Sequence, residues 1–233
     1  MPAKRTRPLT VGGLSAPLEL RESARARRMT LRVDPARGLI QVVVPAGLAE
    51  REAVRFVDRH VAWVRTRLAA LPPERPFVDG AVVPVLGRDH VIRHDPGHRG
   101  GGRREDGVIR VGGGPEHTAR RVRDLLTAEA RRLLTERAHA LAATLGARIG
   151  GVTVRDTRSR WGSCSATGRL SFSWRLILTP EPVFHYVVAH EVAHLLVMNH
   201  SPRFWSQVAR LTPDAGRARA WLRGHGAELL RFG

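Results

Sequence analysis

The stretch His190-Glu191-Val192-Ala193-His194, followed by His200, decides the structural interpretation of this chain. Residues four apart on a helix lie about 40° apart around the axis and about 6 Å along it, so His190 and His194 can reach the same metal ion. Glu191 lies about 100° round from His190 and would face a water molecule bound to that ion. This spacing predicts two zinc ligands and a general base on a single helical turn.

The residues around this motif predict a buried helix, because apolar side chains occupy nearly all of its faces. Two histidines and a glutamate inside such a helix would cost several kcal/mol if they had no polar partners. A metal ion resolves the conflict by binding the imidazoles and giving the carboxylate a water molecule to hold. The apolar positions are Val187, Val188, Ala189, Val192, Ala193, Leu195, Leu196 and Val197.

His200 can join the metal site only if the helix ends before it, because a continuous helix would carry it about 9 Å further along the axis. Asn199 is the expected stop, since asparagine tolerates the left-handed conformation that ends helices. Ser201-Pro202 then predicts the N-cap and first residue of a new helix, with His200 in the turn between the two. The alternatives are that His200 is a solvated turn residue, or that His225 is the third ligand.

Three sequence segments together resemble the YgjP-like metallopeptidase family, whose relatives are the WLM and SprT-like zinc proteases. They are Arg160-Trp161-Gly162-Ser163-Cys164, the motif at 190–194, and Asn199-His200-Ser201-Pro202-Arg203-Phe204-Trp205. The resemblance is sharp from about Arg158 to Trp205 and extends more loosely over the whole chain. It implies a zinc-dependent hydrolase with His190, His194 and His200 as ligands and Glu191 as the general base.

One departure separates the chain from another group of zinc proteases. The distance from His194 to His200 equals the metzincin spacing, but Val197 stands where metzincins have glycine. This difference argues against membership of the metzincins.

The order of predicted elements indicates an α+β fold with two parts. Residues 1–115 are expected to form a small β-rich N-terminal subdomain with one long helix at about 48–71. Residues 116–233 are expected to form a minimal zincin-like metallopeptidase domain, which consists of a backing helix at 116–145, a small sheet and the helix of the His-Glu motif. Gly112-Gly113-Gly114-Pro115 is the expected boundary. The predicted strands are 18–21, 29–33, 39–44, 82–86, 91–92, 108–111, 151–155 and 169–178.

Composition restricts the class of protein further. A chain of 233 residues is long enough for one large or two small cores. Its single cysteine, Cys164, excludes an internal disulfide framework and fits a reducing compartment. The basic N-terminus has no apolar segment behind it, and no run approaches the roughly 20 apolar residues of a membrane span. We therefore expect a cytoplasmic protein with no membrane partner.

The net charge of +18 raises the question of nucleic-acid binding. Lys4 is the only lysine, and the arginines are scattered along the chain instead of forming one block. The sequence also has no aromatic stacking array and no zinc-finger spacing. Any binding to nucleic acid is therefore expected to be non-specific, while an anionic small substrate such as a nucleotide remains an alternative.

The run Arg160-Trp161-Gly162-Ser163 is a candidate substrate-binding rim. Gly162 allows close backbone approach, and a strand beside the zinc helix could pair with an extended peptide. Arg160 could contact a substrate carboxylate or a developing oxyanion. The alternative is a structural bend in which Trp161 fills the core. The neighbouring Cys164 would make the site closed and structural if its thiolate took the fourth zinc position.

These observations favour a zinc peptidase that acts on a peptide or protein and uses one zinc ion per chain. Zinc held by three imidazoles activates a water molecule, and Glu191 removes its proton. A first alternative directs the same water at a phosphoanhydride bond of a nucleotide, although the sequence has no Gly-rich phosphate loop. A second alternative is a zinc-stabilised module associated with DNA, or a DNA-linked protease.

Overall fold

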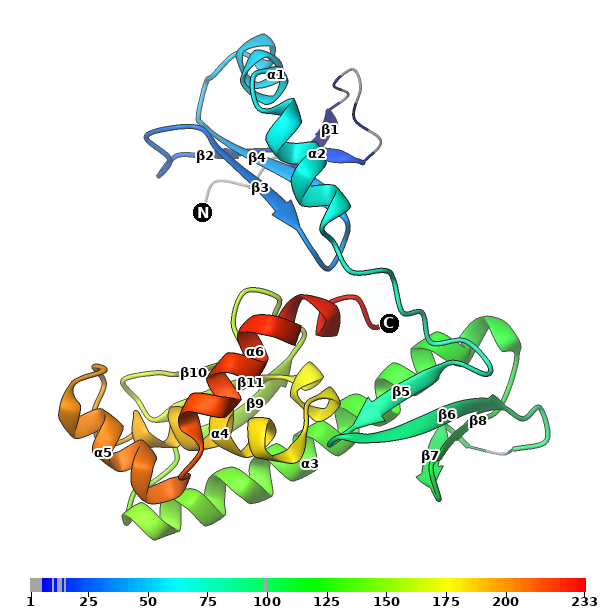
Figure 1. The fold of residues 1–233 in the computed structure, drawn as a ribbon, viewed down its shortest axis with the longest axis vertical. Helices are drawn as coiled ribbons and strands as arrows, with labels where there is room; N and C mark the ends of the chain where they lie inside the picture. The colour runs from blue at the N-terminus through cyan, green and yellow to red at the C-terminus, as the bar shows by residue number, and fades with distance from the viewer. Residues whose placement is uncertain (1–5, 10, 12–13, 15, 99) are drawn as a thin grey trace. The chain divides into compact units, whose positions relative to one another are not determined.

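The computed structural model describes residues 6–9, 11, 14, 16–98 and 100–233 (Figure 1). Its contacts divide the chain into two compact units, Met1–Pro73 and Glu74–Gly233. This division falls before the boundary expected near residue 115. The reason is that the strands between residues 82 and 111 pack against the helix that follows them, so they belong to the second unit.

The first unit is a four-stranded sheet with two helices. The strand order is β1-β2-β4-β3, in which β2 and β4 are parallel and the outer pairs are antiparallel. Alternate residues of β2 and β4, such as Leu20 and Val42, are buried on one face together with Val57 and Val64 of the helices. The elements are β1 (Thr6–Leu9), β2 (Leu18–Ser23), β3 (Thr30–Asp34), β4 (Leu39–Pro45), α1 (Glu50–Asp58) and α2 (Val61–Ala69).

The single helix expected at 48–71 is wrong, because α1 and α2 are separated at Arg59 and His60. A ring nitrogen of His60 lies 2.7 Å from the carbonyl oxygen of Phe56, and its backbone N–H donates to Val57. These local bonds satisfy the last turn of α1 and interrupt the regular helical ladder. The heptad-like apolar stripe continues across the break, which is why the sequence suggested one helix.

The second unit begins with a four-stranded sheet in the order β5-β6-β8-β7. Pro84 lies in the edge strand β5, as expected for a residue that cannot donate a backbone hydrogen bond. The edge strands β1 and β7 were not predicted, because each is short and pairs with a single neighbour. The elements are β5 (Val82–Val85), β6 (Arg88–His94), β7 (Gly102–Glu105) and β8 (Val108–Val111).

Helix α3 (Thr118–Leu145) is the backing helix, and it contacts both this sheet and the elements that follow. It ends at Gly146, whose left-handed conformation (φ 66°) fits the predicted stop. A three-stranded sheet follows in the order β10-β11-β9, formed by β9 (Gly151–Arg155), β10 (Gly162–Cys164) and β11 (Arg169–Ser173). Strand β11 ends five residues before the predicted residue 178, where its pairing with β9 ends, and Trp174–Leu178 forms a buried 3-10 helix.

Helix α4 (Glu181–Ala193) carries most of the motif at 190–194 and is buried on nearly all sides, as its sequence predicts. It contacts α3, β10, α5 (Pro202–Leu211) and α6 (Ala215–Leu229). Figure 1 shows α4 between the long backing helix and α6, with the small sheet beside it. The fold is therefore α+β, with a small β-rich N-terminal unit and a backing helix, small sheet and motif helix in the second. No helix among the described residues is long and apolar enough to cross a membrane.

Candidate metal centre and active site

The structure brings three histidines together at the end of α4. The ligand nitrogens of His190, His194 and His200 all lie within 4.8 Å of one another. The Nε2 atoms of His190 and His200 are 3.1 Å apart. His200 lies directly before Ser201, the N-cap of α5, so the turn between the helices returns it to α4 as the sequence predicted.

Helix α4 ends earlier than expected, and it does not end through a left-handed Asn199. Helix α4 stops at Ala193, with His194 as its C-cap, and irregular turns follow to His200. Among the described non-glycine residues, those with positive φ are Leu86 and Asp106, so Asn199 is not left-handed. Its side-chain oxygen instead accepts a hydrogen bond from the backbone N–H of Ser201 (3.3 Å).

Hydrogen bonds and burial prepare the imidazoles as neutral ligands. Nδ1 of His194 lies 3.0 Å from the carbonyl oxygen of Val197, which can only accept, so the ring donates there and leaves Nε2 for a metal. Burial, followed by the charges of His194, His200 and Arg219, lowers the pKa of His190 to about 4. Burial also lowers the pKa of His194. A metal ligand must be unprotonated, so these shifts favour binding.

This donor set fits a zinc ion. Tetrahedral zinc with Zn–N bonds of about 2.0–2.1 Å places its ligand nitrogens about 3.3–3.4 Å apart, close to the separation between His190 and His200. Among the described residues, one cluster of side chains could hold a metal ion, and it consists of His190, His194 and His200. Cys164 and His225 do not belong to it. The Sγ of Cys164 is directed to the carbonyl of Ser165 (3.4 Å), and burial followed by the charge of Glu191 raises the pKa of its thiol.

His225 has its own partner on α6. Its Nδ1 donates to the carbonyl of Trp221 (3.0 Å), and its ring stacks on that indole with the centroids 4.6 Å apart. The structure therefore brings His200, and not His225, to His190 and His194. Among the described residues no fourth protein ligand joins the three imidazoles, so the arrangement fits an open metal site better than a closed one.

Two aromatic residues of α5 support the three imidazoles. The ring of Phe204 stacks on His194, with the centroids 4.4 Å apart, and contacts the other two edge-on. Trp205 lies beside His190 and His200, with centroid distances of 5.9 and 6.0 Å. Both residues belong to the segment that carried the family resemblance, but the sequence alone gave them no role. Their packing restricts the rotation of the rings and keeps the nitrogens convergent.

Glu191 lies beside the histidines and is buried, with 7% of its surface exposed. Burial raises the pKa of its carboxyl to about 7, although the positive charge of Arg160 opposes the shift. A carboxyl whose pKa lies near neutrality can both accept and return a proton. The backbone of β10 limits its position, because a Cβ atom at Gly162 would lie 2.5 Å from Cγ of Glu191.

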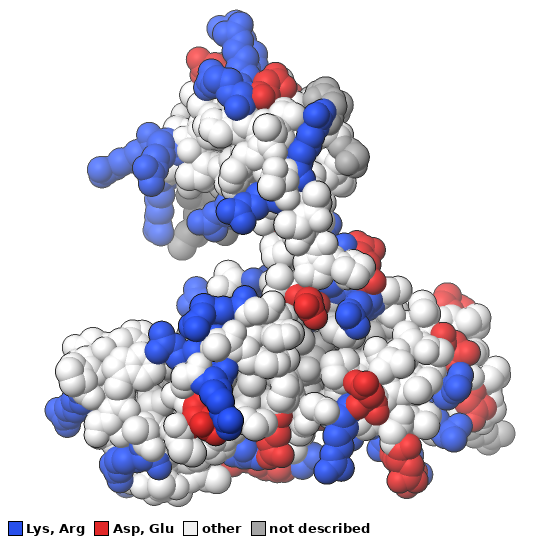
Figure 2. All heavy atoms as spheres, in the orientation of Figure 1, with Lys and Arg blue, Asp and Glu red and all other residues white. Residues whose placement is uncertain are grey.

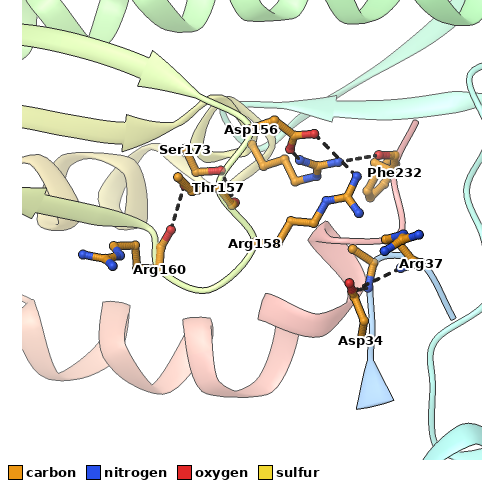
Figure 3. Close-up of polar contacts among 10 residues, drawn as sticks. Asp34, Arg37, Asp156, Thr157, Arg158, Arg160, Ser173 and Phe232 are labelled. Carbon is orange, nitrogen blue, oxygen red and sulfur yellow. Dashed lines mark hydrogen bonds and ion pairs between the residues drawn. The ribbon is translucent and has the colours of Figure 1, made fainter. Parts of the chain in front are cut away.

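The loop before β10 is fixed by an internal set of polar contacts, drawn in Figure 3. The hydroxyl of Thr157 donates to the carbonyl of Arg160 (3.0 Å), and Ser173 donates to the carbonyl of Thr157 (3.2 Å). The buried Arg175 donates to Asp156 at the start of the loop. Burial tends to raise the pKa of Asp156, but the guanidinium of Arg175 outweighs it and lowers that pKa. This anchoring holds β10 against α4.

The predicted substrate-binding rim divides between two cavities. Trp161 and Gly162 line a cavity of about 360 Å³ together with His190 and Glu191. Arg160 and Ser163 line a neighbouring groove of about 680 Å³, and none of the three histidines is among its lining residues. Trp161 is half-buried, and Gly226 of α6 lets its ring approach closely, since a Cβ there would lie 3.3 Å from Cζ2 of the indole. The ring therefore both packs in the domain and lines the cavity.

The sequence places Tyr186 one turn before His190, near the site, but it does not identify the residues that α6 adds to this cavity. Tyr186 is buried, and its hydroxyl lies 3.5 Å from Nδ1 of His190. Helix α6 contributes Arg219, Leu222 and Arg223. Their spacing on one helical face was the available signal, but Arg217 lies on the same helix and all three of its arginines are exposed, so the pattern did not single out Arg219 and Arg223.

The family to which this chain is matched agrees with this geometry. The family described as YgjP-like, metallopeptidase domain, matches residues 27–225. Among solved structures, the crystal structure of the metallopeptidase zymogen of Pyrococcus abyssi abylysin is similar, at 22% sequence identity and a TM-score of 0.36. That similarity covers 42% of this chain and 97% of the other. No curated protein matches the chain.

Proposed function

Since this chain belongs to the YgjP-like metallopeptidase family, we propose that it is a peptidase that binds one zinc ion through His190, His194 and His200. The observation that carries the proposal is the convergence of three imidazoles within 4.8 Å beside a buried carboxyl group. The family match supports a metal-dependent peptidase in general. The donor set supports zinc in particular, because imidazole ligands in a tetrahedral arrangement suit that ion.

In this proposal Glu191 is the general base. Bound zinc would supply a water molecule with a pKa near 7 and polarise the scissile carbonyl. Glu191 takes a proton from the attacking water and passes it to the leaving amine. Its raised pKa of about 7 suits this exchange, because the same carboxyl must be a proton acceptor first and a donor afterwards. Tyr186 lies close enough to His190 to help orient its ring.

Strand β10 is the proposed support for the substrate backbone. It lies at the edge of its sheet, with β11 on one side, and it contacts α4. An extended peptide can add to such an edge through backbone hydrogen bonds, which would place its carbonyl groups near the metal. Arg160, two residues before this strand, would interact with Glu191 or with a substrate oxygen.

The nucleotide and DNA alternatives lack comparable support. The family match indicates a peptide or protein substrate. On the face drawn in Figure 2, the basic side chains stand in several separate groups on each unit, which fits a diffuse basic surface. We therefore propose that binding to DNA is non-specific and falls steeply with salt concentration. A single cysteine supports a reducing location, which we propose to be the cytoplasm.

The decisive experiment is a screen of zinc-loaded protein against a peptide library, with a nucleoside triphosphate panel in parallel. We expect peptide cleavage and no nucleotide hydrolysis. Glu191→Gln should retain zinc and thermal stability, while peptide hydrolysis falls at least about a hundredfold, because the base is lost but no ligand is. Wild-type turnover by Glu191→Gln would contradict the mechanism, and loss of its zinc would identify Glu191 as a ligand.

A further inference from the structure

Helix α6 forms one wall of the cavity that contains His190 and Glu191. Arg219, Leu222 and Arg223 line it, and they are spaced three and four residues apart, so they lie on one face of the helix. Two guanidinium groups therefore border the same space as a metal ligand and the general base. The mechanism proposed above uses neither of them.

Neither arginine has an acidic partner among the described residues. The guanidinium of Arg219 lies over the ring of Trp205, 4.9 Å from its centroid, which positions the group without neutralising it. Arg223 forms no ion pair or hydrogen bond with any described residue. Arg217 on the same helix differs, because it pairs with Asp214 at 2.6 Å. The cavity therefore contains two arginines that have no acidic partner among the described residues, whereas Arg217, outside the cavity, has one.

The other walls of the cavity are largely apolar. Trp161, Tyr186, Val187 and Leu222 present apolar surface to the cavity. Arg219 and Arg223 are themselves exposed, so a bound carboxylate would be shielded from water only where it packs against these apolar walls, and there its ion pair would be stronger than one on an open surface. A volume of about 360 Å³ lies within the range of small-ligand pockets. It is large enough to admit one side chain or one chain end of a peptide.

The balance of charge in the cavity favours an anion. Among the described residues that line it, Glu191 is the acidic one, and two arginines face it. The net charge of these lining residues remains positive even when Glu191 is ionised. In a peptide, the anionic group that matches a guanidinium is a carboxylate, which can accept two parallel hydrogen bonds from the guanidinium fork.

We propose that Arg219 and Arg223 form a carboxylate-binding subsite for a substrate residue next to the scissile bond. The carboxylate is that of an aspartate or glutamate side chain, or the free C-terminus of the peptide. This inference rests on the proposed peptidase function and adds its substrate class. It predicts an enzyme that selects acidic positions, or one that removes residues from chain ends.

Matched peptides test the subsite and separate its two sources of carboxylate. One set carries Glu or Gln on each side of the scissile bond in turn, and a second ends in a free carboxylate or an amide. Zinc-loaded protein should cleave the carboxylate member of one set with a kcat/KM at least about tenfold higher, as expected for a charge-assisted hydrogen bond. Preference in the first set identifies a side-chain carboxylate, and preference in the second identifies the C-terminus.

Variants on α6 assign the preference to residues. Arg219→Gln and Arg223→Gln should each bring the ratio of kcat/KM between paired peptides toward one. Arg217→Gln, on the same helix but outside the cavity, should keep the wild-type ratio. Bound zinc and melting temperature are measured on every variant. If Arg219→Gln does not fold, Arg223→Gln still decides, because Arg223 is exposed and forms no ion pair or hydrogen bond with a described residue.

The outcomes distinguish this inference from the peptidase proposal. Hydrolysis with equal kcat/KM for both members of every pair overturns the subsite and leaves the peptidase function standing. If no peptide is cleaved, the peptidase function fails, and calorimetric titration of the same peptides onto the zinc-loaded protein decides the subsite. Tighter binding of the carboxylate peptides that is lost in Arg223→Gln supports it, whereas equal or absent binding overturns it.

Discussion

Gly162 of β10 lies directly against Glu191 of α4, so that an added Cβ atom would stand 2.5 Å from Cγ and 2.7 Å from Oε1 of the glutamate. Real Cβ atoms do not approach that closely, so any other residue at this position must displace the carboxyl group. The edge strand and the motif helix are therefore in close contact at the carboxyl group that we propose as the general base. The position of Glu191 is determined by a backbone contact as much as by its own helix.

Gly162→Ala should consequently reduce turnover without removing the metal. Displacement of a catalytic group by about 1 Å can cost about a hundredfold in rate, and we expect a fall of that order in kcat. Zinc content should remain at the wild-type level, because the three atoms nearest to an added Cβ all belong to Glu191 and none to a histidine. Gly216→Ala, where an added methyl group meets open space, is the matched control and should retain full activity.

Substitution of single histidines should show which of them bind zinc. His190→Ala and His194→Ala should lose zinc, as measured by elemental analysis, and His200→Ala should bind it more weakly, because three imidazoles converge on one point. His225→Ala should keep the wild-type affinity, since its ring is held by Trp221. Equal zinc in His194→Ala and wild type would refute the site.

Arg160 should tune the general base through its charge. The positive charge of Arg160 lowers the pKa of Glu191, against the larger effect of burial. Arg160→Ala should therefore raise that pKa and move the acidic limb of the pH profile of kcat to higher pH. Arg169→Ala is the control, because Arg169 lines the same groove without affecting the carboxyl. An unmoved acidic limb would remove Arg160 from the active site.

The stability of the metal-free protein should reveal two opposed titrations. The pKa of His190 is lowered from 6.5 to about 4, so its contribution to stability is present above pH 6.5 and is lost as the pH falls toward 4. The pKa of Glu191 is raised from 4.5 to about 7, so its contribution is present below pH 4.5 and is lost as the pH rises toward 7. The two effects partly cancel between these limits.

Glu191→Gln should remove the titration of the carboxyl group and leave that of His190. Metal-free Glu191→Gln should gain stability as the pH rises from about 4 to 6.5 more steeply than metal-free wild type. Urea unfolding at several pH values measures the difference. Parallel curves for the two proteins would show that the carboxyl titrates normally.

The ion pair between Arg175 and Asp156 should be the main anchor of the loop before β10. Asp156→Asn leaves a buried guanidinium without its charged acceptor and should destabilise the protein by about 2 kcal/mol. Because the pKa of Asp156 is lowered, this stabilisation is present above its ordinary pKa near 3.8 and is lost as the pH falls below that value. Asp214→Asn, in an exposed pair, should change stability by less than about 0.5 kcal/mol.

The local parts of the site followed from residue types and spacing. The buried motif helix, the turn that returns His200 and the end of α3 at Gly146 all depend on neighbours within a few positions along the chain. The same local reasoning failed at two helix boundaries, where the sequence pattern was compatible with more than one end point. It joined α1 and α2 across His60, and it placed the end of the motif helix at Asn199 instead of Ala193. Hydrogen bonds with nearby carbonyl groups decided those positions.

The sequence by itself determined the α+β class, the family resemblance and the histidine and glutamate positions, because helical periodicity and short-range spacing are properties of the chain alone. Tertiary structure decided which distant residues share the cavity. Gly162 meets Glu191 because β10 packs on α4, and Arg219 and Arg223 line the same cavity as Glu191 because α6 also packs there. Contacts between elements separated by tens of residues depend on how the layers pack, and no local pattern encodes that packing.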